Sequence, residues 1–173
     1  MMGIFGWNAD MEFCCRLFYP ELGGGSLYDI GIYPMELLPY YADQKILAMQ
    51  FLKKDYPTGV DDMVSLNLQL EHCIANIQCS FTTKMPEDAY LYGSDGYIHI
   101  PKIHFGNRAR LYDLNDRLVE DFHEGEENGF YYEAKEVISC IQKGQTESAV
   151  CPLEMTLENA RLFDQVLRGE GRD

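Results

Sequence analysis

Positive charge is scarce in this sequence. Its 173 residues include 14 Lys and Arg against 28 Asp and Glu, which gives a formal net charge of −14 and a pI near 4.6. A surface of this sign repels phosphate backbones and anionic lipids, so neither nucleic acid nor an acidic membrane is an expected partner. Asp10 and Glu12 also interrupt the first apolar stretch, so no secretory leader is expected.

Long apolar runs and spaced metal ligands are absent as well. No run approaches the roughly 18 apolar residues of a membrane-spanning helix, so no membrane partner is expected. The six cysteines form no Cys-x-x-Cys pair and no Cys/His ladder, so neither a zinc site nor another metal site is expected. Without a leader, the thiols are expected to be reduced, as in a cytoplasmic protein.

Nucleotide-binding motifs are missing too. No Gly-x-Gly-x-x-Gly follows a strand and opens a helix, and there is no P-loop, His-Glu-x-x-His or Gly-x-Ser-x-Gly motif. At about 150 residues per domain, the length predicts a single domain over residues 1–173, with no room for a second domain that holds a cofactor. This chain alone is therefore expected to bind neither NAD nor NADP.

Alternation of apolar and polar residues predicts a mostly antiparallel sheet. Residues 64–71 and 73–82 both alternate strictly, so they are expected to pair as a hairpin. Extended chain is also expected over residues 4–19, 45–53, 90–100 and 103–122. The polar face of the central hairpin carries Asn, Gln, Ser and Thr. That composition suits either contact with another protein or a hydrated sheet face.

A helical period appears in residues 26–41, 128–143 and 155–167. Ser26 is the expected N-cap of the first helix, with Asp29 completing a Ser-x-x-Asp capping box. Pro34 removes a backbone donor and is expected to disturb that helix. An apolar stripe marks the second helix: Ala134, Val137, Ile138 and Ile141. These elements predict an α+β fold, an open-faced sheet with helices packed on one face.

Residues able to carry chemistry gather near the first helix. The run Gly23-Gly24-Gly25 either offers amides to an anion or is simply a loop that enters the helix. Asp29 and Tyr33 lie four residues apart, where a phenol could move a proton and a carboxylate could orient it. The same spacing fits a capping aspartate beside a half-buried tyrosine. Arg16 either binds a substrate oxygen or pairs with a carboxylate such as Glu21.

The segment Arg16–Pro34, RLFYPELGGGSLYDIGIYP, resembles the GGG-x-L-x-D-x-G-x-[HY] segment of the glucose–fructose oxidoreductase/inositol dehydrogenase/MocA family. The segment has tyrosine rather than histidine at its last position, and in this it resembles the dimeric dihydrodiol dehydrogenase branch. Residues 58–62, 93–98 and 128–148 agree with the family in the same order. The resemblance implies a C-terminal domain like that of dihydrodipicolinate reductase. It also implies an N-terminal Rossmann domain, absent here, that carries the glycine fingerprint and a Glu-Lys-Pro lysine.

The same resemblance implies a function. Tyr33 takes the catalytic, proton-transferring position with Asp29 beside it, Arg16 binds substrate, and the Rossmann half of the full-length enzyme holds NAD or NADP. The substrate would be a small molecule, a sugar, polyol or dihydrodiol, oxidised or reduced at a hydroxyl carbon between the two halves. A homodimer is expected through the open sheet face, near Asn67, Gln69, Gln78 and Ser80. Two alternatives stay open: a non-catalytic homodimeric interaction module, and a split-enzyme subunit completed in trans.

Overall fold

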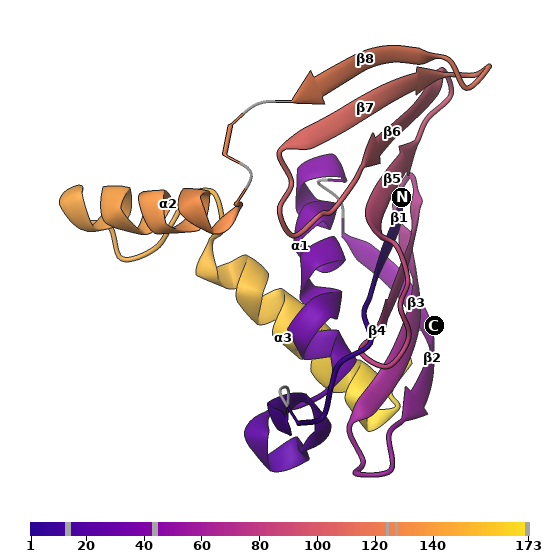
Figure 1. Ribbon diagram of the computed structural model, residues 1–173, viewed down its shortest axis with the longest axis vertical. Helices are drawn as coiled ribbons and strands as arrows, with labels where there is room; N and C mark the ends of the chain where they lie inside the picture. Colours follow the sequence, from indigo (N-terminus) through magenta and orange to yellow (C-terminus); the bar gives the residue numbers. More distant parts are fainter. Residues whose placement is uncertain (13–14, 43–44, 124, 127, 172–173) are drawn as a thin grey trace.

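One eight-stranded sheet organises the molecule, in the order β2-β3-β4-β1-β5-β6-β7-β8. The computed structural model describes residues 1–173 except 13–14, 43–44, 124, 127 and 172–173. β1 runs parallel to β4, and every other neighbouring pair is antiparallel. Helices α1 and α3 cover one face of the sheet (Figure 1). The predicted α+β architecture, with an open and mostly antiparallel sheet, is confirmed.

The elements have the following bounds. The strands are β1 (Met2–Gly6), β2 (Ile46–Asp55), β3 (Asp61–Leu70), β4 (Ile74–Ser80), β5 (Glu87–Tyr92), β6 (Gly96–Ile100), β7 (Arg108–Asp113) and β8 (Leu118–His123). The helices are α1 (Ile32–Tyr41), α2 (Phe130–Gln142) and α3 (Leu153–Arg168). Short turns η1 (Cys15–Phe18), η2 (Pro20–Leu22) and η3 (Leu27–Gly31) precede α1. In the described part of the chain, no helix has the length and apolar character needed to cross a membrane.

The hairpin of β3 and β4 forms the centre of the core. Its register pairs Leu66 with Ile77, and both side chains are fully buried. On the helix side they belong to the same apolar cluster as Leu27, just ahead of α1, and Phe163 of α3. Burial of each such side chain stabilises the fold by about 1.5–3 kcal/mol. The hairpin predicted from the strict alternation in the sequence is confirmed.

The expected extended chain over residues 4–19 is wrong beyond β1. Residues 15–18 and 20–22 form 3-10 turns, the second of them beginning at Pro20. Leu17 and Phe18 turn inward from these residues to a small second cluster with Val60 and Phe81. Aromatic residues without period-two alternation therefore marked a buried loop rather than a strand.

The expected capping of the first helix by Ser26 is also wrong. Ser26 already has helical backbone angles, φ −76° and ψ −32°, and its side chain caps nothing. The chain first makes a π-helical turn over Leu27–Gly31, and α1 begins only at Ile32. Pro34 falls in the first turn of α1, directly after this π-helical turn.

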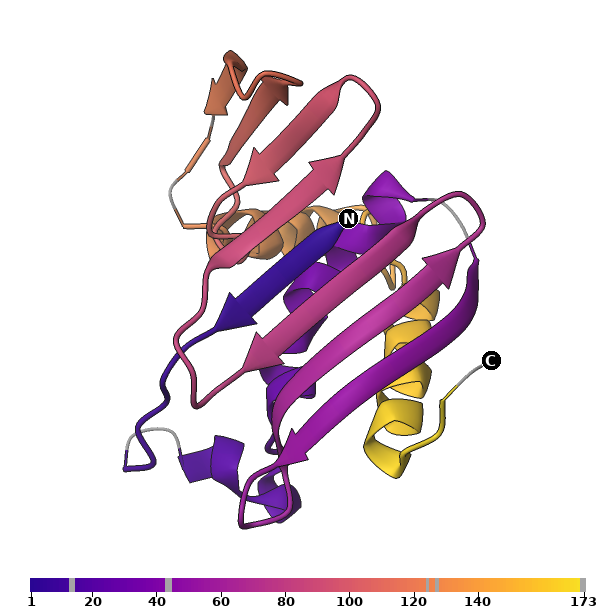
Figure 2. The same cartoon turned by 90° about the vertical axis from the view of Figure 1, so that its right-hand side faces the viewer.

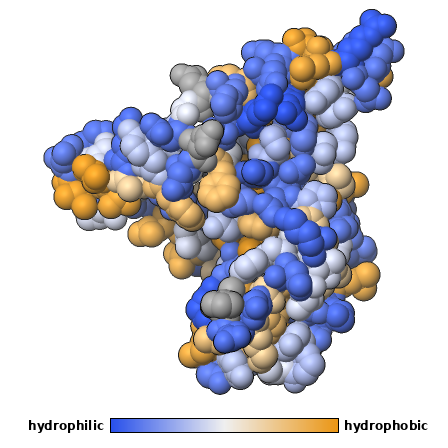
Figure 3. Space-filling view, in the orientation of Figure 1, coloured by the Kyte–Doolittle hydropathy of each residue, from blue (hydrophilic) through white to orange (hydrophobic). Residues whose placement is uncertain are grey.

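Helix α2 departs from the expectation that all helices pack on the sheet. It projects away from the body of the molecule (Figure 1), and of its residues, all of which the structure describes, only Cys140 is buried. Its apolar stripe is open to solvent, with Val137, Ile138 and Ile141 exposed by 57%, 55% and 71%. Apolar side chains are visible on this arm in Figure 3. The stripe therefore marks a surface rather than a contact within this chain.

The opposite face of the sheet carries no helix and is seen face-on in Figure 2. Asn67 of β3 pairs in register with Asn76 of β4, and the Asn76 amide donates to Asn67 Oδ1 at 2.7 Å. Ser80 belongs to this face by register but is fully buried, and its hydroxyl accepts the N–H of Thr82. The Ser80 side chain is therefore covered within this chain, and an interface near it stays a prediction.

Candidate active site

The glycine run ahead of α1 is shaped by a buried carboxylate. Gly25 has φ +116°, and a Cβ built there would lie 2.1 Å from Asp61 Oδ1. A Cβ on Gly24 would lie 2.5 Å from the carbonyl oxygen of Leu17. Both positions therefore need glycine to let the backbone approach its neighbours closely.

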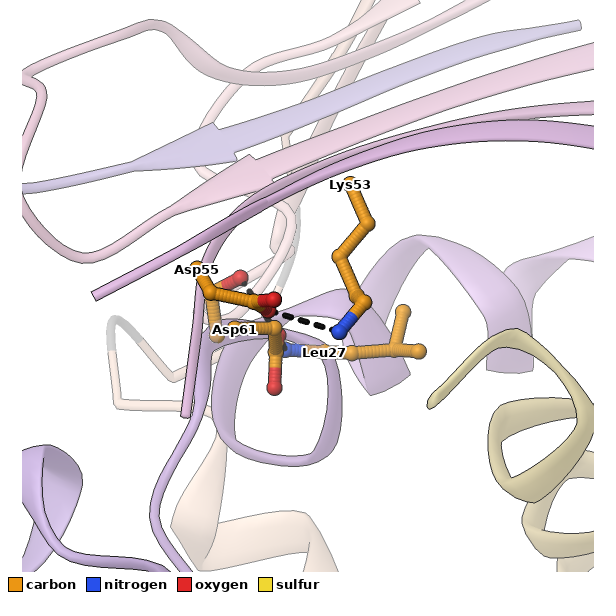
Figure 4. A network of polar contacts seen from close by, with 5 residues as sticks. Leu27, Lys53, Asp55 and Asp61 are labelled. Carbon is orange, nitrogen blue, oxygen red and sulfur yellow. Dashed lines mark hydrogen bonds and ion pairs between the residues drawn. The ribbon is translucent and has the colours of Figure 1, made fainter. Parts of the chain in front are cut away.

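Asp61 supplies the cap that Ser26 does not. Its Oδ2 accepts the Leu27 N–H at 2.7 Å (Figure 4) and the Ser26 hydroxyl at 2.9 Å. Beside it in Figure 4, Lys53 pairs with Asp55 at 2.6 Å. Burial raises the pKa of Asp61, and the hydrogen bonds from Leu27 and Ser26 oppose that shift.

The amides at this helical entrance therefore already face an anion that belongs to the chain. A nucleotide phosphate bound by the glycine run would compete with the Asp61 carboxylate for the Leu27 N–H. The geometry therefore favours the interpretation that the three glycines form a loop leading into the helix. It does not fit the interpretation that they bind a cofactor phosphate. Among the described residues, no three His, Cys, Asp or Glu side chains are grouped to hold a metal ion.

Arg16 and Asp29 form an ion pair across the glycine run. Arg16 Nη2 donates to Asp29 Oδ1, and Nη1 donates to the carbonyl oxygen of Gly23 at 3.2 Å. The Asp29 side chain is 21% exposed and that of Arg16 is 54% exposed. The carboxylate thus holds the guanidinium while leaving part of it open to solvent. The alternative partner Glu21 is wrong: Asp29 takes this place.

Tyr33 lies in the first turn of α1 within an aromatic group. Its ring centroid is 5.4 Å from that of Phe5 and 6.1 Å from that of His104. His104 stacks on Phe5 at 4.8 Å. Nothing in the sequence indicated His104 or Phe5 as neighbours of Tyr33, because the sheet brings them there from distant segments.

The surroundings of Tyr33 favour its protonated form. Burial raises the pKa of Tyr33, and the carboxylates of Glu133 and Asp29 raise it further. The phenol therefore carries its proton at neutral pH and suits a proton donor. To act as a base it would need a cation beside it. Glu133 belongs to the first turn of α2, so the charge of this helix disfavours the phenolate of Tyr33.

We expect the phenol of Tyr33 to titrate above the ordinary tyrosine value of about 10. Glu133→Gln removes a negative charge that opposes the phenolate, so it should lower the pKa of Tyr33 toward that value. NMR titration of tyrosine ring carbons, with Tyr33→Phe to assign the signal, measures both values. Glu136→Gln on the same helix is the matched control, and an equal shift in both variants would contradict this account.

Sequence comparison places this chain beside curated dehydrogenases. It is 30% identical over 155 residues to trans-1,2-dihydrobenzene-1,2-diol dehydrogenase of Mus musculus, covering 86% of this chain and 46% of that protein. It is also 30% identical over 169 residues to the enzyme of the same name from Xenopus tropicalis, covering 90% of this chain and 50% of that protein. The chain therefore spans about half the length of these relatives.

Solved structures share the fold. The aldose-aldose oxidoreductase of Caulobacter crescentus superimposes with a TM-score of 0.79 at 21% identity, over 96% of this chain and 51% of that one. A 3-ketoreductase of Actinomadura kijaniata, in complex with TDP-benzene and NADP, superimposes with a TM-score of 0.77 at 18% identity. The match covers 98% of this chain and 53% of that one. The sequence model of the GFO/IDH/MocA C-terminal domain matches residues 5–99, more than half of the chain. This chain accordingly belongs to the GFO/IDH/MocA family of oxidoreductases, as a C-terminal domain.

Proposed function

We propose that this domain supplies the substrate-binding and proton-transferring residues of an NAD(P)-dependent oxidoreductase. The substrate class is a sugar, polyol or dihydrodiol that reacts at a hydroxyl-bearing carbon. The observation that carries the proposal is the grouping of Arg16, Asp29 and Tyr33 where the chain enters α1. Relatives named for dihydrodiol and aldose oxidoreduction support this class of reaction.

The three residues divide the work. Tyr33 transfers the proton: it donates to a carbonyl oxygen during reduction and accepts from the hydroxyl during oxidation. Asp29 holds Arg16 in place, and the half-exposed guanidinium keeps N–H groups free to bind a substrate oxygen. NAD or NADP, bound to another half of the enzyme, supplies the hydride chemistry. The raised pKa of Tyr33 suits the donor role, and a cation brought by that half would suit the acceptor role.

The half that binds the cofactor would cover the side of the domain that bears α2. The exposed stripe of Val137, Ile138 and Ile141 offers an apolar contact there. The half could be part of a longer chain or a separate subunit that completes a split enzyme in trans.

Reading the genomic frame ahead of the codon for Met1 tests this proposal. We expect a Gly-x-Gly-x-x-Gly fingerprint and a Glu-Lys-Pro segment, either in frame or in an adjacent gene. The assembled enzyme should oxidise a sugar, polyol or trans-dihydrodiol with NAD or NADP, and titration calorimetry should detect no cofactor binding to this chain alone. Micromolar binding by this chain, or no turnover by the assembly, would overturn the proposal.

The open sheet face favours a second function, a homodimeric interaction module that performs no chemistry. Its central strands present Asn67, Gln69 and Gln78, none of them charged, with exposed Leu52 and Ile74 on the same face. Lys54, the lysine of this face near the end of β2, is paired with Asp62 rather than free. Such a face suits a two-fold contact between copies, of about 2,000 Å² in total. Dimerisation is also compatible with the enzyme.

We expect a homodimer that the double variant Gln69→Lys/Gln78→Lys converts to monomer. Two copies would then place four like charges in one contact, which is unfavourable. The overall charge cannot explain a loss of dimer. The two lysines make the net charge of −14 less negative, which by itself would weaken the repulsion between copies and promote association. Light scattering at micromolar concentration measures the mass. The control Gln142→Lys/Gln145→Lys adds the same charge outside the sheet, and a monomeric wild type would refute the contact.

A further inference from the structure

Asp61, the first residue of β3, is a buried carboxylate with no step of its own in the proposed reaction. It is only 2% exposed and forms no ion pair with another described residue. Lys53, which lies beside it in Figure 4, pairs with Asp55 instead. Buried charges are usually paired, because an isolated one is costly, so stability alone does not account for this carboxylate.

The cap that Asp61 provides comes from a distant element of the fold. A helix is ordinarily capped by the side chain of the residue just before it, which fixes the first turn only relative to itself. Here the Leu27 N–H and the Ser26 hydroxyl both donate to a carboxylate on a strand, at 2.7 and 2.9 Å. The entrance to η3 and α1 is thereby tied to the sheet.

The proposed catalytic grouping is attached to this tied entrance. Asp29, two residues after Leu27, belongs to η3 and holds Arg16. Tyr33 follows in the first turn of α1 and packs on Phe5 of β1, with 5.4 Å between the ring centroids. A shift of the entrance relative to the sheet would therefore displace both the guanidinium and the phenol.

We infer that Asp61 is a positioning residue, which holds the proposed catalytic grouping in the geometry that a substrate needs. It acts through Ser26 and Leu27 and touches no reacting atom. A misplacement of 1 Å can cost an enzyme about 100-fold in rate, so a fixed entrance matters to turnover beyond its effect on the fold. The effect on turnover rests on the proposed function, whereas the effect on the structure of this domain does not.

Asp61→Asn tests the inference, with Asp62→Asn as the matched control. The amide keeps the shape of the Asp61 carboxylate but brings N–H donors to an entrance that itself presents donors. Asp62 is the next residue and is also 2% exposed, but its side chain binds Lys54 and Thr82 rather than the entrance. The control therefore removes the same buried charge from the same strand without loosening η3.

NMR of this chain alone gives the structural readout. In the wild type we expect nuclear Overhauser contacts between the rings of Tyr33 and Phe5, and a guanidinium of Arg16 whose rotation is slowed by pairing with Asp29. Asp61→Asn should weaken both signals, because the entrance moves relative to the sheet. Asp62→Asn should leave both as they are.

Steady-state kinetics of the assembled enzyme give the functional readout. Asp61→Asn should lower kcat about tenfold or more and also raise KM, because Tyr33 and Arg16 are both displaced. A smaller folded fraction lowers the apparent kcat but leaves KM unchanged, so the rise in KM separates positioning from stability. Asp62→Asn should keep the wild-type KM.

Unchanged NMR signals in Asp61→Asn, or equal changes in the two variants, would overturn the inference. So would an unchanged KM in an active assembly, a result that leaves the proposed function standing. An assembly without turnover contradicts the proposed function instead, and the NMR signals then decide the positioning role. If circular dichroism shows Asp61→Asn unfolded, Ser26→Ala replaces it: this variant removes one donor to Asp61, and unaltered NMR signals there would overturn the inference.

Discussion

Tyr33→Phe lowers turnover about 100-fold or more in the enzyme assembled with its cofactor-binding half, if Tyr33 moves the substrate proton. The substitution removes one hydroxyl and keeps the ring, so the contacts with Phe5 and His104 remain. The expected loss therefore falls on turnover, with stability nearly unchanged. Steady-state kinetics of the assembled enzyme measure the loss, and thermal unfolding of this chain checks its stability.

Tyr41→Phe is the matched control for this change, since Tyr41 is a partly exposed tyrosine at the other end of α1. It should retain wild-type turnover. Asp29→Asn should have a smaller effect than Tyr33→Phe, because it loosens Arg16 without removing the proton donor. Wild-type rates in Tyr33→Phe would show that the phenol serves packing alone.

Gly25→Ala should destabilise the domain by about 2–5 kcal/mol. A residue with a side chain pays about 1–2 kcal/mol for a left-handed backbone, and φ is +116° here. The added Cβ would also meet Asp61 Oδ1 at 2.1 Å, which forces the carboxylate away from the Leu27 N–H. An unpaired buried group adds about 1–3 kcal/mol. Urea unfolding, followed by circular dichroism, measures the loss.

Gly23→Ala separates the two causes. Gly23 also has a positive φ, +69°, but a Cβ there meets no atom within 4 Å. It should cost only about 1–2 kcal/mol, the backbone part of the effect. Equal losses in the two variants would show that contact with Asp61 plays no role in the need for glycine at position 25.

Local patterns predicted much of this fold. The β3–β4 hairpin followed from strict alternation, and the turn from Gly93 to Gly96 followed from its glycines, since both signals arise between residues close in the sequence. The helical stripe of α2 correctly located the helix but not its environment. Periodicity shows that a face is apolar, whereas the surrounding chain decides whether anything covers it.

The candidate site divides in the same way. The sequence alone determined that Asp29 and Tyr33 share the entrance of one helix and that three glycines precede it, because spacing and backbone freedom are local properties. Only the tertiary structure decided that Asp61, 34 residues from Leu27, caps that entrance and that Arg16, 13 residues from Asp29, pairs with it. These contacts depend on how sheet and loops return to one another. Their free energy comes from burial and charge pairing, which no local pattern records.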